Sequence, residues 1–123
     1  MDDSYNASPA SMLAALELLS EMRGRRLALL GDMLELGAAE EEAHRQAGEA
    51  AARACDDLLL VGERAATMAE AAVAAGLRQV RVFGSKRDVV AALQGELRPG
   101  DYLLVKASRA LALETVVEEL RAR

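Results

Sequence analysis

Leu27-Ala28-Leu29-Leu30-Gly31-Asp32 is the stretch that decides the fold. Four apolar residues follow one another without alternation, which is typical of a short strand buried on both faces of a parallel sheet. The glycine lets the chain turn tightly after the strand, and the aspartate places a carboxylate at the strand's carboxyl end. Ligands of open parallel sheets bind outside that end of the strands. The stretch therefore predicts a buried strand and the edge at which a site would lie.

Three further apolar runs punctuate the chain, at 58–61, 80–83 and 102–105. The runs at 58–61 and 102–105 are apolar throughout, so we expect strands buried on both faces. The run at 80–83 alternates, which favours a place near the sheet edge. Helical patterns lie around the runs, with Ser8-Pro9 as the N-cap and first-turn proline of one and Gly76 as the C-terminal stop of another. The expected helices cover 9–19, 38–54, 65–75, 85–97 and 111–120.

Strands that alternate with helices predict parallel pairing with right-handed crossovers. The expected fold class is therefore α/β, a three-layer Rossmann-like domain with a mainly parallel sheet and helices on both faces. A chain of 123 residues and 13.1 kDa is one domain of ordinary size, which we assign to 1–123. It contains no internal repeat or linker.

Charge and composition exclude several classes of function. Lysine and arginine number 15 against 20 acidic residues, a net charge of −5, and only 2% of residues are aromatic, which disfavours nucleic-acid binding. Cys55 is the only cysteine, which excludes an internal disulfide and a cysteine-based zinc site. No apolar run reaches the roughly 18 residues of a membrane span, and the acidic N-terminus is unlike a signal peptide. We expect a cytoplasmic monomer, and Met1 is compatible with a start placed on a domain cut from a longer protein.

Polar residues collect directly after the four runs. By topology Asp32, Ser85, Lys106, Ser108 and Arg109 share the carboxyl edge of the sheet. Lys106 follows a buried strand and would hold an anion, with Arg109 as a bidentate clamp for a carboxylate or phosphate. The alternative is structural: helix caps after any parallel strand, and for Lys106 a surface cation near an acidic residue.

Three other features are open to a functional and a structural interpretation. The polar segment 2–9 either places side chains at a ligand or is a frayed terminus. His44, the only histidine, is by itself a surface or packing residue. Arg23, Arg25 and Arg26 form a basic turn that we interpret as a solvated loop. The sequence has neither a G-x-x-x-x-G-K-[ST] phosphate loop nor a G-x-G-x-x-G fingerprint, so it lacks the usual means of holding a triphosphate by itself.

Several of these motifs occur in an order that resembles a known family. They are the segments 2–9 (DDSYNASP), 30–37 (LGDMLELG) and 104–109 (LVKASR), with His44 between the last two. This pattern resembles the C-terminal domain of the Mur ligases over the whole chain, and within that family the branch that adds D-alanyl-D-alanine to UDP-N-acetylmuramoyl-tripeptide in bacterial cell-wall (peptidoglycan) synthesis.

The resemblance implies an ATP-dependent, ADP-forming ligase whose other domains are absent from this chain. A central ATPase domain would carry the phosphate loop and the Mg²⁺ ligands, and an N-terminal domain would bind the UDP-sugar peptide. ATP would phosphorylate the tripeptide carboxylate, and the amine of D-alanyl-D-alanine would then displace phosphate. This chain would close over the active site, would hold no cofactor alone, and would show no ligase activity alone.

The same resemblance assigns roles to residues. It implies that Asp2, Asp3, Tyr5, Asn6 and Pro9 lie near the nucleotide. It also implies a substrate-binding set for the dipeptide and its phosphate side, with His44 as a neighbour: Asn6, Asp32, Lys106, Ser108 and Arg109.

Two positions depart from the family's usual pattern. Ser8 replaces an asparagine, which removes one amide but keeps a helix cap, and Ala107 replaces a glycine. If position 107 needs a positive φ, alanine strains it by roughly 1–2 kcal/mol.

Three rival interpretations remain at this stage. A receiver domain of two-component signalling would use Asp2-Asp3, Ser85 and Lys106, although no buried strand precedes the acidic pair. A non-catalytic binding module of the same fold would bind ligand without turnover. A Mur ligase for a different amino acid is disfavoured by Tyr5-Asn6.

Overall fold

The computed structural model describes residues 8–34 and 36–106. Its helices are α1 (Pro9–Ser20), the 3₁₀ helix η2 (Gly37–Ala39), α2 (Glu40–Ala54), α3 (Ala65–Ala74) and α4 (Lys86–Glu96). Its strands are β1 (Arg26–Leu30), β2 (Asp57–Val61), β3 (Gln79–Phe83) and β4 (Tyr102–Lys106). The helix expected at 111–120 lies outside the described residues.

The strands of the described chain form one sheet in the order β3-β2-β1-β4, and every neighbouring pair is parallel. The edge position expected for 80–83 is confirmed by β3. The expectation that 102–105 is buried on both faces is wrong for the described chain, because Tyr102 is exposed and residues 103–105 are only partly buried. In the described sheet β4 lies at an edge. Its apolar composition matches that of a central strand, so sequence alone could not separate the two positions.

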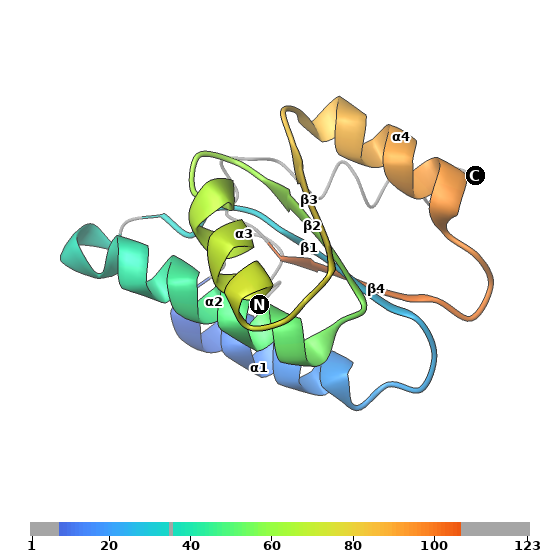
Figure 1. Ribbon diagram of the computed structural model, residues 1–123, viewed down its shortest axis with the longest axis horizontal. Helices are drawn as coiled ribbons and strands as arrows, with labels where there is room; N and C mark the ends of the chain where they lie inside the picture. Colours follow the sequence, from blue (N-terminus) through green and yellow to red (C-terminus); the bar gives the residue numbers. More distant parts are fainter. Residues whose placement is uncertain (1–7, 35, 107–123) are drawn as a thin grey trace.

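Helices cover both faces of the sheet, which confirms the three-layer α/β class (Figure 1). Side chains of a strand alternate between faces. Ala28 and Leu30 pack with α1, α2 and α3, whereas Leu27 and Leu29 pack with α4 on the opposite face. The central strands β1 and β2 are therefore apolar throughout because each of their faces has a helical layer against it.

The helix boundaries follow the local signals in the sequence. Ser8 caps α1: its Oγ accepts the N–H of Ser11 at 3.2 Å, while Ser11 Oγ accepts the N–H of Ser8 at 3.0 Å. The cap that replaces the family's asparagine is therefore present. Ser85 caps α4 through the N–H of Asp88, and Gly76, at φ +106°, ends α3.

Helices α2 and α3 pack at unusually short range through small side chains. Ala47 and Ala51 of α2 and Ala72 of α3 are buried in the same core. At Gly48 an added Cβ would lie 2.3 Å from the backbone oxygen of Met68. No side chain larger than hydrogen fits there unless the helices separate, so this glycine sets the distance between them.

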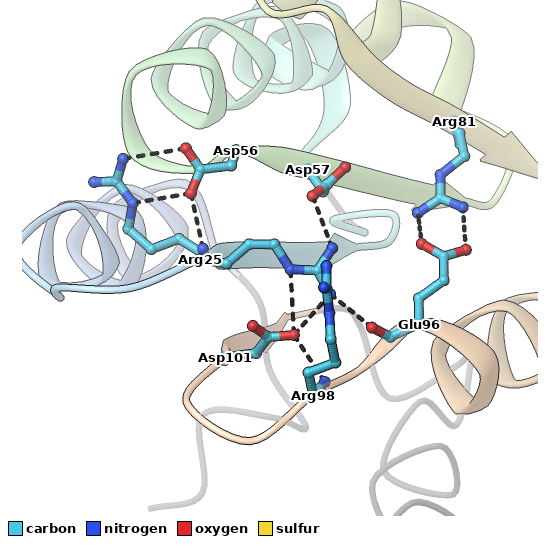
Figure 2. Close-up of polar contacts among 8 residues, drawn as sticks. Arg25, Asp56, Asp57, Arg81, Glu96, Arg98 and Asp101 are labelled. Atoms are coloured by element: carbon cyan, nitrogen blue, oxygen red, sulfur yellow. Dashed lines mark hydrogen bonds and ion pairs between the residues drawn. The ribbon is translucent and has the colours of Figure 1, made fainter.

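The basic turn before β1 is an ion-pair network at the amino ends of the strands, and the expectation of a solvated loop is wrong for two of its three arginines (Figure 2). Arg25 Nη2 donates to Asp101 Oδ2 at 2.7 Å and to the backbone oxygen of Glu96 at 2.8 Å. Its Nη1 lies 3.4 Å from Asp57 Oδ2. Arg25 thus joins β1 to β2, to the end of α4 and to the turn before β4. Its partners are distant in sequence, which hides the network from a local pattern.

The network's carboxylates make the fold acid-sensitive. A hydrogen bond from Arg25 lowers the pKa of Asp101, and one from Arg81 lowers the pKa of Glu96. Because both pKa values are lower in the folded than in the unfolded chain, these groups stabilise the fold above the unfolded pKa, and that stabilisation is lost as the pH falls through the folded values.

We therefore expect the urea concentration at the unfolding midpoint to decrease once the pH is lowered below about 5, where carboxyl groups with ordinary pKa values start to protonate. The decline should be shallower in Arg25→Met, because Asp101 loses the donor that lowers its pKa. Arg23→Met, an exposed position in the same turn, controls for the loss of one positive charge. Urea titrations from pH 7 to pH 3 measure the effect, and equal slopes in Arg25→Met and wild type would contradict it.

Cys55 is 5% exposed, and its Sγ lies 3.2 Å from the backbone oxygen of Ala51. Burial, together with the charges of Asp56 and Asp57, raises the pKa of this thiol to about 12. At pH 8 the folded chain should therefore react with a disulfide reagent about three orders of magnitude more slowly than the urea-unfolded chain, since the thiolate is the nucleophile. Because this cysteine is the only one, absorbance of the released thiol measures it without ambiguity. Comparable rates in the two states would refute the expectation.

Candidate functional site

The strand order places one topological switch point at the carboxyl edge. From β1 the chain proceeds to β2 and β3 on one side and then crosses to β4 on the other. The crevice outside the carboxyl ends of β1 and β4 is where open α/β sheets bind ligands. Leu30 is in register with Lys106, and the N–H of Gly31 donates to the backbone oxygen of Lys106 at 2.9 Å. The loop after β1 and the end of β4 therefore meet at this point.

Asp32 joins the loop after β1 to the turn after β2. Its Oδ2 accepts the N–H of Glu63 at 2.9 Å, and its Oδ1 accepts the N–H of Arg64 at 2.8 Å. The carboxylate is 6% exposed and lies at the start of α3, where unpaired N–H groups and the helix dipole favour negative charge. Both oxygens thus have a structural partner, which sequence spacing alone did not indicate.

Gly62 makes room for this carboxylate. Its φ is +117°, and an added Cβ would lie 2.6 Å from Asp32 Oδ1. Glycine is required here both by the backbone conformation and by the closeness of the carboxylate. The glycine after the second run is therefore part of the support of Asp32.

His44 supports the next residue of the same loop. The N–H of Met33 donates to His44 Nε2 at 2.9 Å, and His44 Nδ1 lies 2.7 Å from the backbone oxygen of Glu40. The imidazole and the Met33 side chain are both 0% exposed. Of the two interpretations of His44, packing is therefore the one realised, but through hydrogen bonds to a loop at the switch point. His44 Nε2 accepts from a backbone N–H, so the pattern of side chains could not have predicted this contact.

Lys106 is the last residue of β4 and is 3% exposed. The surface placement in the structural alternative is therefore wrong, and Asp101, one acidic residue near it in the sequence, pairs with Arg25. The position places a cation at the edge that Asp32 also faces, as the sequence predicted. Ser85 follows β3, three strand spacings or about 14 Å from β4, so it does not join this group.

Pro9 begins α1, and its end of the helix faces the same edge. Arg26 Nη1 donates to the backbone oxygen of Ser20 at the amino end of β1, so the other end of this helix, about 18 Å away, lies toward the carboxyl edge. The remaining residues of the predicted sites lie outside the described residues: Asp2, Asp3, Tyr5, Asn6, Ser108 and Arg109. The φ of Ala107 lies there too.

No cluster of three metal-ligating side chains occurs within 8–34 and 36–106. In the same ranges, no helix combines the length and hydropathy that a membrane crossing requires.

Fold and site together define a class. A sheet in the order 3-2-1-4, with helices on both faces and polar residues at its switch point, is a doubly wound α/β domain. Receiver-type domains have the order 2-1-3-4-5, so the strand order argues against that alternative. The chain belongs to the family described as "Mur ligase, glutamate ligase domain", which matches residues 1–109. The resemblance seen in the motifs is thereby confirmed.

Three curated relatives carry the name UDP-N-acetylmuramoyl-tripeptide–D-alanyl-D-alanine ligase. The relative from Synechocystis is 42% identical over 124 residues, which is 99% of this chain and 27% of the relative. The relative from Escherichia coli is 40% identical, and the match covers 98% of this chain and 26% of the relative. The relative from Bacillus subtilis is 36% identical, and the match covers 98% of this chain and 27% of the relative.

Solved structures agree with the sequence comparison. A MurF ligase from Thermotoga maritima in complex with ADP matches with a TM-score of 0.77 and 28% identity over 99% of this chain and 27% of that chain. MurF from Acinetobacter baumannii matches with a TM-score of 0.82 and 28% identity, and the match covers 99% of this chain and 28% of that chain. The chain thus spans about a quarter of the length of the relatives it matches.

Proposed function

We propose that this chain is the C-terminal domain of an ATP-dependent, ADP-forming ligase that adds D-alanyl-D-alanine to UDP-N-acetylmuramoyl-tripeptide in cytoplasmic peptidoglycan synthesis. The names of the relatives and the ADP bound in one structural neighbour support this proposal. The observation in this chain that carries it is Lys106, a buried cation at the switch point beside the Asp32 loop.

The chemistry of the dipeptide suits this edge. The nucleophile is its amine, which must be uncharged to attack, so its carboxylate is the group available for recognition by charge. A lysine in low-dielectric surroundings attracts a carboxylate more strongly than one in water. We assign the dipeptide carboxylate to Lys106, with Asn6, Ser108 and Arg109 completing the substrate-binding set and Asp32 shaping its border.

The nucleotide belongs to the same proposal. Asp2, Asp3, Tyr5, Asn6 and Pro9 would face ATP, whereas Mg²⁺ and the phosphates would be held by the remaining three quarters of the ligase. Pro9 supports this placement, because it begins the helix whose N-terminal end points to the carboxyl edge. Alone, the chain is a monomer that binds weakly and does not turn over.

A chimeric ligase tests the proposal. This chain replaces the matching quarter of the Bacillus subtilis relative, and ADP release is measured with and without D-alanyl-D-alanine. We expect release that depends on the dipeptide in the chimera and none from the chain alone. Lys106→Met should raise the KM for the dipeptide by about 10- to 100-fold, the loss expected for one hydrogen bond to a charged group. Lys86→Met, the other lysine of the chain, on α4, is the matched control.

The outcomes separate the proposal from its alternative. Turnover by the 123-residue chain would refute the assignment of catalysis to the other domains. A chimera with normal dipeptide dependence despite Lys106→Met would refute the role of this lysine. In NMR titrations of the chain, amide shifts with D-alanyl-D-alanine but not with L-alanyl-L-alanine, together with a folded but inactive chimera, would favour a non-catalytic binding module.

A further inference from the structure

His44 closes a ring of hydrogen bonds around the carboxyl edge. Its Nδ1 contacts the backbone oxygen of Glu40, one helical turn earlier, and its Nε2 accepts from Met33. Asp32, the neighbour of Met33, accepts the N–H of Arg64, and Arg64 Nε returns to Glu40 Oε1 at 2.6 Å. The ring thus links the start of α2, the loop after β1 and the turn after β2.

The two contacts of His44 specify one form of its ring. The backbone oxygen of Glu40 can only accept, so Nδ1 must carry a proton. The N–H of Met33 can only donate, so Nε2 must carry a lone pair. The imidazole is therefore neutral with its proton on Nδ1, and no other tautomer or charge state satisfies both partners.

Within the ring, His44 is the member whose loss has no substitute. The Glu40–Arg64 pair is exposed, so water can replace its hydrogen bond. Both His44 and Met33 are 0% exposed, so a shorter side chain at position 44 leaves the N–H of Met33 in a buried space without the acceptor that Nε2 provides. An unsatisfied buried donor is costly, and the loop relieves that cost by moving. Movement of Met33 displaces Asp32, because the two are joined by one peptide bond.

We propose that His44 is a positioning residue, whose neutral Nδ1–H imidazole holds the Asp32 loop in register with Lys106 for binding of the incoming dipeptide. The positioning of the loop by His44 rests on the observed contacts. The effect of that positioning on dipeptide binding rests on the proposed function. His44 does not touch substrate in this assignment and transfers no proton.

The first test uses the chain itself. The only histidine of the chain gives unambiguous long-range ¹H–¹⁵N NMR signals. At pH 7.5 we expect a protonated Nδ1 and an unprotonated Nε2. A ring protonated at Nε2 would overturn the proposal.

Two variants separate the two nitrogens. His44→Gln retains an acceptor near the place of Nε2, whereas His44→Asn retains only a donor near the place of Nδ1. Relative to core amides such as that of Leu59, hydrogen exchange of the Met33 amide should accelerate on the order of tenfold in His44→Asn. The exchange rate of the Met33 amide should change less than threefold in His44→Gln. It should also change less than threefold in Arg45→Ala, a control at an exposed position on the same helix. Equal acceleration in the Asn and Gln variants, or none in either, would overturn the positioning.

The second test uses the chimeric ligase. His44→Asn should raise the KM for D-alanyl-D-alanine by about tenfold with little change in kcat, and His44→Gln should restore it. An unchanged KM alongside accelerated Met33 exchange would overturn the link between the loop and the dipeptide. If the chimera with the unaltered chain is inactive, the proposed function fails, and the NMR arms still decide the positioning.

Discussion

Gly62→Ala should lower the free energy of unfolding by about 3 kcal/mol or more. The positive φ costs an alanine about 1–2 kcal/mol, and displacing the Asp32 carboxylate from its two N–H partners costs about 1.5–3 kcal/mol further. The added Cβ would lie within 3.0 Å of both carboxylate oxygens. Urea unfolding followed by circular dichroism measures the loss.

A second glycine isolates the part that is due to the carboxylate. Gly76 has φ +106° but open space around its missing Cβ, so Gly76→Ala should cost only the backbone component, about 1–2 kcal/mol. In an Asp32→Ala background, the loss of unfolding free energy caused by Gly62→Ala should fall to a similar value, because the added Cβ no longer overlaps the carboxylate. The same cost for Gly62→Ala in both backgrounds would show that the carboxylate is not what confines this position.

Gly48→Ala should be the other strongly destabilising change, by about 3 kcal/mol. Alanine ordinarily stabilises a helix by about 1 kcal/mol relative to glycine, but here its Cβ meets the Met68 backbone oxygen at 2.3 Å. A backbone oxygen cannot rotate away, so α2 and α3 must move apart.

Gly95→Ala is the matched control, in the last turn of α4 with nothing within 4 Å of its missing Cβ. It should raise stability by about 0.5–1 kcal/mol, opposite in sign to Gly48→Ala. The urea midpoints of the two variants are compared directly. A stabilised Gly48→Ala would mean that the two helices are not held at the distance described.

The strands and helix starts could be predicted because their causes are local. Four apolar residues at 27–30 predict a strand with two covered faces, and Ser8 and Ser85 each precede a helix that they cap. Alternation correctly placed β3 at an edge, but β4 has the composition of a central strand and lies at an edge of the described sheet. Whether a strand lies at the centre or the edge of a sheet depends on which other strands pair with it. The apolar composition of a strand does not contain that information.

The contacts that build the site could not be predicted, because they are distant and involve backbone groups. Asp32 was recognised as a site residue, yet its partners are N–H groups 31 and 32 residues further along. His44 was open to two interpretations, and its partner Met33 contributes only its N–H. Arg25 looked like a solvated cation because its acceptors lie in three other segments. Side-chain type predicts what a residue can bind, but the topology decides which group it meets.

The placement of Asp32 has a consequence for how this fold meets phosphates. In dinucleotide-binding relatives of the architecture, a helix N-terminus at the switch point receives the pyrophosphate. Here the N-terminus of α3 already holds an internal anion, and the first turn of α2 carries Glu40, Glu41 and Glu42. The N-termini of the helices that follow β1 and β2 therefore both have carboxylates beside them. Negative side chains at these two helix ends offset the attraction that a free helix N-terminus has for phosphate.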